Sequence, residues 1–175
     1  EPAANWHGVR AALAGNPEQV AVPGMVVAAG ATTVEVLAVR PLVSGSEVAG
    51  EDSAEQNDSS LVLRVTTPEL RLLLSGDVEE AGQRNAVTRV ADLSAEVMLV
   101  PHHGSAHQDA AYLAAVHASV ALISVGAEND YGHPAARTVD SVAGTGAQIF
   151  RTDRSGAIAV SRRDGELTVT TQRSG

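Results

Sequence analysis

The chain has 175 residues, of which 44% are hydrophobic, and a formal net charge of −9. This length and hydrophobic content suffice for one domain with a real core and exclude a disordered segment. The absence of cysteine excludes a disulfide scaffold and any cysteine-ligated metal site. The acidity argues against a broad basic surface for nucleic acid, so a phosphate-bearing ligand would need a metal ion or a local basic cluster.

The first part of the chain has a strand-rich pattern of apolar runs. In chain order we predict a helix, two strands, a polar surface loop, and two strands that form a hairpin: residues 5–14, 20–29, 32–39, 44–60, 61–65 and 70–74. Pro68 supports the hairpin because it lies between the last two strands, where a turn tolerates proline.

From residue 79 onward, predicted helices alternate with short apolar strands. The helices cover 79–90, 109–117 and 134–143, and the strands cover 97–100, 120–125 and 147–150. Pro134 suits the first position of its helix. A last hairpin, of strands over 157–161 and 166–171, turns at Asp164-Gly165, and residues 162–171 are expected at the edge of the sheet. The predicted fold class is therefore α+β, a single domain with a mixed sheet and flanking helices.

Side chains that can ligate metal ions follow three of the predicted strands. These are Asp77, the adjacent pair His102 and His103, and His133. In open α/β sheets, ligands gather beyond the carboxyl ends of strands. One carboxylate with two or three imidazoles suits an ion such as zinc or manganese. The pattern therefore predicts a metal site at this end of the sheet.

Each of these residues also has a purely structural interpretation. Asp77 could cap the helix that begins near residue 79, and His133 could cap the helix that begins at Pro134. A single histidine beside a strand is more often a hydrogen-bonded core residue than a ligand. Two adjacent rings at the end of an apolar strand both need partners, however. The pair His102-His103 is therefore the strongest indication of a metal site.

Five blocks occur in a fixed order along the chain: NDSSLVL over 57–63, LLSGDVE over 73–79, VPHHGS over 100–105, ISVGAENDYGHP over 123–134, and RTDRSGAI over 151–158. In this order they resemble the carboxyl-terminal part of the metallo-β-lactamase-like domain of ComEC-type competence proteins, the DNA-uptake channels of bacterial membranes. The resemblance covers roughly residues 34–159. It implies a four-layer αββα sandwich, of which residues 1–175 would form a partial domain.

The resemblance also implies a hydrolytic site for two divalent metal ions, zinc or manganese. Asp77 would bridge both metals, and Asp77 and His103 are the candidate catalytic residues. One residue of the His102/His103 pair, with His103 preferred, would ligate the first metal, and His133 would ligate the second. The other histidine of the pair would orient a ligand or donate to the substrate. The two cations would hold a hydroxide nucleophile and neutralise a phosphodiester.

Three further residues are candidates for contacts to the substrate or to the metal ligands. Ser105 could contact substrate or, more simply, cap the helix that follows it. Asn129 lies in the loop before His133. Asp153 could orient a ligand histidine through a hydrogen bond, or it could begin the turn over 154–156.

In function, the resemblance implies a metal-dependent phosphodiesterase or nuclease that degrades the strand of incoming DNA that is not transported. The partners would be DNA, single-stranded or duplex, and the membrane channel of the same polypeptide. The chain would be a soluble domain of a bacterial inner-membrane protein, on its extracytoplasmic side. The alternatives are a small phosphoester hydrolase of the same superfamily and a non-catalytic module that supports the channel.

One departure from the family pattern qualifies this interpretation. The superfamily motif His-x-His-x-Asp-His is absent, and the only histidine before residue 100 is His7. We therefore expect the chain to be a fragment that begins inside the domain, binds metal weakly or not at all, and is inactive alone. A half-sandwich would also expose a sheet face or edge, so we expect a homodimer of the fragment.

Overall fold

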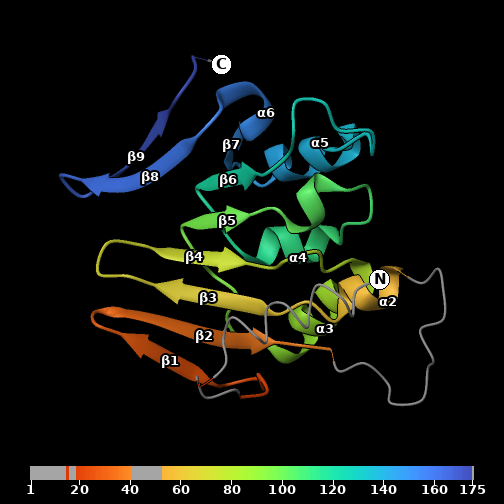
Figure 1. Cartoon of the computed structure of the whole chain (residues 1–175), viewed down its shortest axis with the longest axis vertical. Coiled ribbons are helices and arrows are strands. Elements are labelled where there is room, and N and C mark those ends of the chain that lie inside the picture. Colours follow the sequence, from red (N-terminus) through yellow and green to blue (C-terminus); the bar gives the residue numbers. More distant parts are fainter. Residues whose placement is uncertain (1–14, 16–18, 41–52, 175) are drawn as a thin grey trace.

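The computed structural model describes residues 15, 19–40 and 53–174. Its main feature is a seven-stranded sheet with the strand order β1-β2-β3-β4-β5-β6-β7 (Figure 1). Its strands are β1 (Val26–Ala29), β2 (Thr32–Ala38), β3 (Val62–Thr66), β4 (Arg71–Leu74), β5 (Val97–Leu99), β6 (Val120–Ile123) and β7 (Gln148–Arg151). The first four strands pair antiparallel and the last four parallel, which confirms the predicted mixed sheet.

The described helices are α2 (Ser53–Asp58), α3 (Glu80–Arg89), α4 (Ala110–Ala115), α5 (Ala136–Gly144) and the single turn α6 (Thr152–Ser155), and a 3-10 turn, η1, covers Pro101–Gly104. The helices α3, α4 and α5 connect the parallel strands, as the alternating pattern predicted, whereas α2 lies between β2 and β3 and α6 follows β7. The third predicted helix begins at Ala136 and not at Pro134. None of the described helices is long and apolar enough to span a bilayer.

Three elements predicted in the first third of the chain lie outside the described residues or differ from the prediction. The helix over 5–14 and the first residues of the loop over 44–60 lie outside the described residues. The remainder of that loop was predicted wrongly, because Ser53–Asp58 is helical and contains the good helix formers Ala54, Glu55 and Gln56. The strand over 20–29 is confined to β1, because Pro23-Gly24 forms a turn before it.

The carboxyl-terminal hairpin forms a sheet of its own, so the prediction that residues 162–171 form the edge of the main sheet was wrong. Strands β8 (Ile158–Arg163) and β9 (Glu166–Thr171) pair only with each other, and Figure 1 shows them diverging from β7. The cause lies before β8, where Gly156 has a φ of 67° and redirects the chain after α6. The turn at Asp164-Gly165, with φ angles of 52° and 85°, is confirmed.

The helices and the hairpin cover opposite faces of the sheet. Leu73 and Met98 point to the helical side, where they form one core with residues of α3, α4 and α5. Leu72, next to Leu73, and Leu122, between the core residues Ala121 and Ile123, instead face the hairpin across a cavity of about 520 Å³ that β8 also lines. This alternation follows the two-residue period of a strand.

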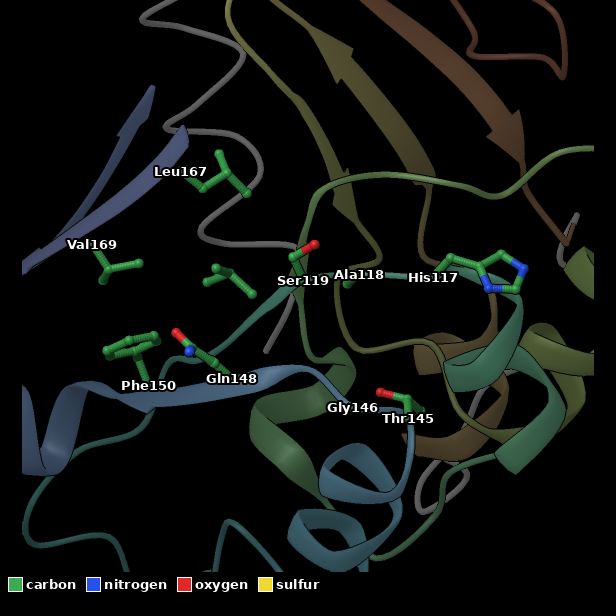
Figure 2. A pocket seen from close by; sticks show the side chains of 10 residues that line it. His117, Ala118, Ser119, Thr145, Gly146, Gln148, Phe150, Leu167 and Val169 are labelled. Carbon is green, nitrogen blue, oxygen red and sulfur yellow. The ribbon is translucent and has the colours of Figure 1, made fainter. Parts of the chain in front are cut away.

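A second cavity, of about 600 Å³, lies between β9 and the strands β6 and β7. Figure 2 shows Leu167 and Val169 of the hairpin on one side of this space, and Phe150 and Gln148 of β7 on the other. The second layer therefore covers the sheet incompletely in the described part of the chain. Two facing sheets with helices on the outer side are compatible with an α+β sandwich.

Candidate functional site

The four predicted donors lie together beyond the carboxyl ends of β4, β5 and β6. His103 Nε2 is 3.7 Å from Asp77 Oδ1. The ring centroids of His102 and His103 are 6.3 Å apart, and those of His102 and His133 are 5.4 Å apart. These strands are parallel neighbours, so the loops that follow them emerge at one end of the sheet. The fold thus places donors from three separate loops in one cluster.

The turn η1 holds both histidines of the pair in an unusual backbone conformation. His102 and His103 have φ angles of 47° and 52°, in the left-handed region, which costs non-glycine residues on the order of 1–2 kcal/mol each. The turn is held by a hydrogen bond from His102 N to Gly76 O at 3.0 Å and one from Ser105 N to His102 O at 2.8 Å. Such strain in two adjacent residues is typical of functional sites, where it aims side chains.

Hydrogen bonding determines which nitrogen of His103 is free. Its Nδ1 lies 2.7 Å from the carbonyl oxygen of Ser124, which can only accept, so Nδ1 carries a proton. In the neutral ring the Nε2 lone pair then faces the Asp77 carboxylate, a second electron-pair donor. Two such donors repel each other unless a proton or a cation lies between them. The side chains of His103 and Asp77 are about half exposed, so an ion has access.

His102 faces a different carboxylate. Its Nδ1 lies 3.1 Å from Glu79 Oε1, but the angles do not allow a hydrogen bond, and this buried nitrogen has no hydrogen-bond partner in the described part of the chain. Glu79 Oε1 accepts a hydrogen bond from Asn57 Nδ2 at 3.0 Å. His102 is also less exposed than His103. The two histidines therefore have different surroundings, and only His103 is directed at Asp77.

The third imidazole, that of His133, is held by the loop that precedes it. Asn129 Oδ1 accepts from His133 N at 3.0 Å, and Asn129 Nδ2 donates to His133 O at 2.9 Å. Burial lowers the pKa of His133, and the neighbouring His102 and His103 lower it further, while Asp77 opposes them. The ring is therefore neutral at pH 7, as a metal ligand must be.

Asp77 does not cap helix α3, because a more distant carboxylate does so. Asp58, 5% exposed, accepts from Glu79 N at 3.0 Å and from Gly82 N at 2.8 Å, and it pairs with Arg40 at 3.1 Å. These contacts satisfy two of the free amides at the start of the helix. The block over 57–63 thereby positions Glu79, and leaves the Asp77 carboxylate free for the cluster.

Two glutamines, the buried Gln83 and the partly buried Gln108, connect the Asp77 loop to the histidine turn. Gln83, fully buried, donates through Nε2 to Val78 O at 2.8 Å and to Gln108 Oε1 at 2.9 Å. Gln108 Nε2 donates in turn to Pro101 O at 3.1 Å. Gln83 Oε1 accepts from Asp109 N at 2.7 Å. This chain of amides, which we call the glutamine clamp, spans from the residue after Asp77 to the residue before His102.

Two of the remaining candidates, Ser105 and Asp153, are held in place by contacts within the fold. Ser105 is 1% exposed, and helix α4 is capped by Asp109, which accepts from Tyr112 N, and not by Ser105. Asp153 forms a double hydrogen bond with Arg151, at 3.0 and 2.6 Å, which lowers the pKa of this carboxyl. Capping by Ser105 was therefore predicted wrongly, and Asp153 is held by its own neighbour.

The donor types suit zinc or manganese, but the cluster is not a complete coordination shell. Among the residues that the structure describes, no three His, Cys, Asp or Glu side chains are grouped so as to hold a metal ion. The pair Asp77 and His103 nevertheless fits part of such a shell, because the carboxylate and the imidazole face each other with no positive charge between them. The donors present thus fit a metal in kind but not in number.

A pocket of about 430 Å³ opens beside the cluster. It is lined by two of the donors, by the loop before His133 and by the first residue of α6: His103, Ser124, Val125, Gly126, Asn129, Tyr131, His133 and Thr152. Thr152 Oγ1 bonds both the amide and the carbonyl of Val125, at 2.8 Å each, which ties α6 to the end of β6. The ring of Tyr131 stacks near His133, with a centroid distance of 6.0 Å and an interplanar angle of 20°.

Sequence reasoning missed several of these residues. Tyr131 and Thr152 lie inside the blocks over 123–134 and 151–158, so their place in these blocks could have identified them as residues of the site. Asp58 and Glu79 lie inside the blocks over 57–63 and 73–79, but their roles depend on contacts across more than twenty residues. For Gln83, a helical glutamine with no motif around it, no sequence signal exists.

Two curated proteins are similar to this chain. It is 32% identical over 108 residues to ComE operon protein 3 of Bacillus subtilis, which covers 61% of this chain and 14% of that protein. It is 34% identical over 106 residues to Competence protein ComA of Neisseria gonorrhoeae, covering 59% of this chain and 15% of that protein. The chain thus spans about one seventh of the length of these relatives. No family model and no solved structure matches it.

Proposed function

We propose that the chain is the donor-bearing part of a metal-dependent phosphodiesterase that acts on DNA in a bacterial uptake system. The observation that carries the proposal is the contact between His103 Nε2 and Asp77 Oδ1 at 3.7 Å, with Nδ1 of the same ring held by Ser124. The similarity to ComE operon protein 3 and to Competence protein ComA supports the biological setting.

Asp77, His103 and His133 are the residues that would hold the metal. A bound divalent ion would supply a hydroxide at neutral pH and charge stabilisation for a phosphodiester. Ser124 fixes the tautomer of His103 through its carbonyl, and Asn129 fixes the loop of His133. These contacts to the second nitrogen and to the backbone are the kind that orient metal ligands.

The remaining ligands would come from a His-x-His-x-Asp-His motif in a longer natural protein. Residues 1–175 contain no such motif, so we propose that they form part of a domain. The proposal extends to the partners: DNA and a membrane channel that belongs to the same polypeptide. Pairing of two copies through the incompletely covered sheet stays a prediction.

The test uses the longest natural chain that contains these residues. We expect it to cleave labelled DNA when manganese or zinc is added, and Asp77→Asn to reduce cleavage to background. Asp140→Asn, which makes the same replacement of one carboxylate oxygen by an amide group on the exposed face of α5, is the matched control and should retain activity. Metal binding without DNA cleavage would instead support a small phosphoester substrate. Full activity of Asp77→Asn would contradict the proposal.

A further inference from the structure

The lining of the pocket beside the donor cluster favours a nucleobase over a phosphate group. Its lining contains no Arg or Lys, and its only ionisable groups besides Tyr131 are the imidazoles of His103 and His133. The loop that forms one wall also carries Glu128 and Asp130, two carboxylates that repel a phosphate. The pocket therefore disfavours an anionic group, which is compatible with an uncharged ligand group.

Tyr131 gives the pocket an aromatic surface. The residue is 85% exposed, and its ring lies nearly parallel to that of His133. The adjoining loop is rigidly closed, because Asn129 bonds Gly126 O at 3.1 Å and both backbone groups of His133. An aromatic ring on a fixed loop loses little entropy when a flat group stacks on it.

We propose that this pocket binds an unpaired nucleobase, with Tyr131 as the stacking surface, and that the site therefore takes single-stranded nucleic acid. The inference rests on the proposed function and names its substrate class. A base inside a duplex has both faces covered by its neighbours, so only an unstacked base reaches the tyrosine ring. The volume of about 430 Å³ lies within the range of roughly 300–1,000 Å³ typical of small-ligand pockets.

In this proposal the base and the phosphodiester of the substrate bind at two adjoining places. The base would occupy the uncharged pocket, and the adjoining phosphodiester would lie toward Asp77 and His103, where the proposed cation offsets its charge. His103 belongs to both places, so a base in the pocket would bring its own phosphate toward Asp77. The acidic net charge of the chain is compatible with binding that depends on stacking more than on arginine contacts.

The test measures binding of the full chain to three fluorescent probes with manganese present. They are a thymidine decanucleotide, an abasic polymer of the same length and charge, and the duplex form of the decanucleotide. We expect the decanucleotide to bind more tightly than the other two. Tyr131→Ala should weaken this binding by roughly 5- to 150-fold, the range of one lost base–aromatic stack, whereas Tyr131→Phe should bind like the natural chain.

Two controls separate stacking from misfolding. Val27→Ala truncates another exposed side chain, on the far edge of the sheet, and should change no affinity. Binding of the abasic polymer should be equal in the natural chain and in Tyr131→Ala. Equal binding of the decanucleotide and the abasic polymer, or binding to none of the probes, would overturn the inference. DNA cleavage that depends on Asp77 in the longer protein would then still support the proposed function.

Discussion

Replacing Gln83 with methionine tests whether the glutamine clamp holds the candidate site. Gln83→Met keeps the length and approximate volume of the side chain but removes its hydrogen bonds at 2.8, 2.9 and 2.7 Å. At about 1 kcal/mol of net stability for each bond, the free energy of unfolding should fall by about 3 kcal/mol. This is a large share of the roughly 5–15 kcal/mol that domains of this kind possess.

Urea denaturation followed by far-ultraviolet circular dichroism measures the change. With a slope of about 2 kcal/mol/M, the unfolding midpoint should move down by about 1.5 M. Gln56→Met is the matched control, because Gln56 is exposed on α2 and its side chain makes no hydrogen bond to the residues that the structure describes. If Gln83→Met shifts the midpoint no more than this control does, the clamp does not stabilise the fold and the reasoning is wrong.

The remaining predictions concern stability away from the donors. Asp58→Ala removes the cap of α3, and we expect urea denaturation to show a loss of about 2–3 kcal/mol. Gly82→Ala would normally stabilise a helix by about 1 kcal/mol. Here the added Cβ meets Val78 and lies 3.0 Å from Asp58 O, so the melting temperature should fall. Arg151 lowers the pKa of the Asp153 carboxyl below its usual 3.8, so this pair stabilises the fold above that pH. Asp153→Asn should cost about 0.5–1 kcal/mol at pH 7 and progressively less as the pH falls through the native pKa.

Much of the architecture could be predicted from local sequence. The strands after residue 60 and the helices between them follow the apolar periodicity, and every observed boundary lies within two residues of the prediction. The α6 turn, the helix α2 and the separate sheet of β8 and β9 were not predicted. The hairpin itself was, because Asp164-Gly165 is a local turn signal, but its placement depends on the redirection at Gly156.

The candidate site, too, could be predicted only in part. The chain order of Asp77, the histidine pair and His133, each after a strand, was enough to predict that they gather at one end of the sheet. The parallel pairing of β4, β5 and β6 then determines the cluster. The role of each donor within it could not be predicted, because equivalent imidazoles are distinguished only by what their ring nitrogens meet.

The sequence by itself determined which segments form strands and helices and which donors follow them, because these depend on side-chain period and on nearest neighbours along the chain. Only the tertiary structure decided that Asp58 and not Asp77 caps α3, and that His103 faces Asp77 while His102 faces Glu79. It alone revealed the glutamine clamp. Except for the bond from Gln83 to Val78, these contacts join residues more than twenty positions apart, and their partners meet only once the folded sheet has brought the loops together.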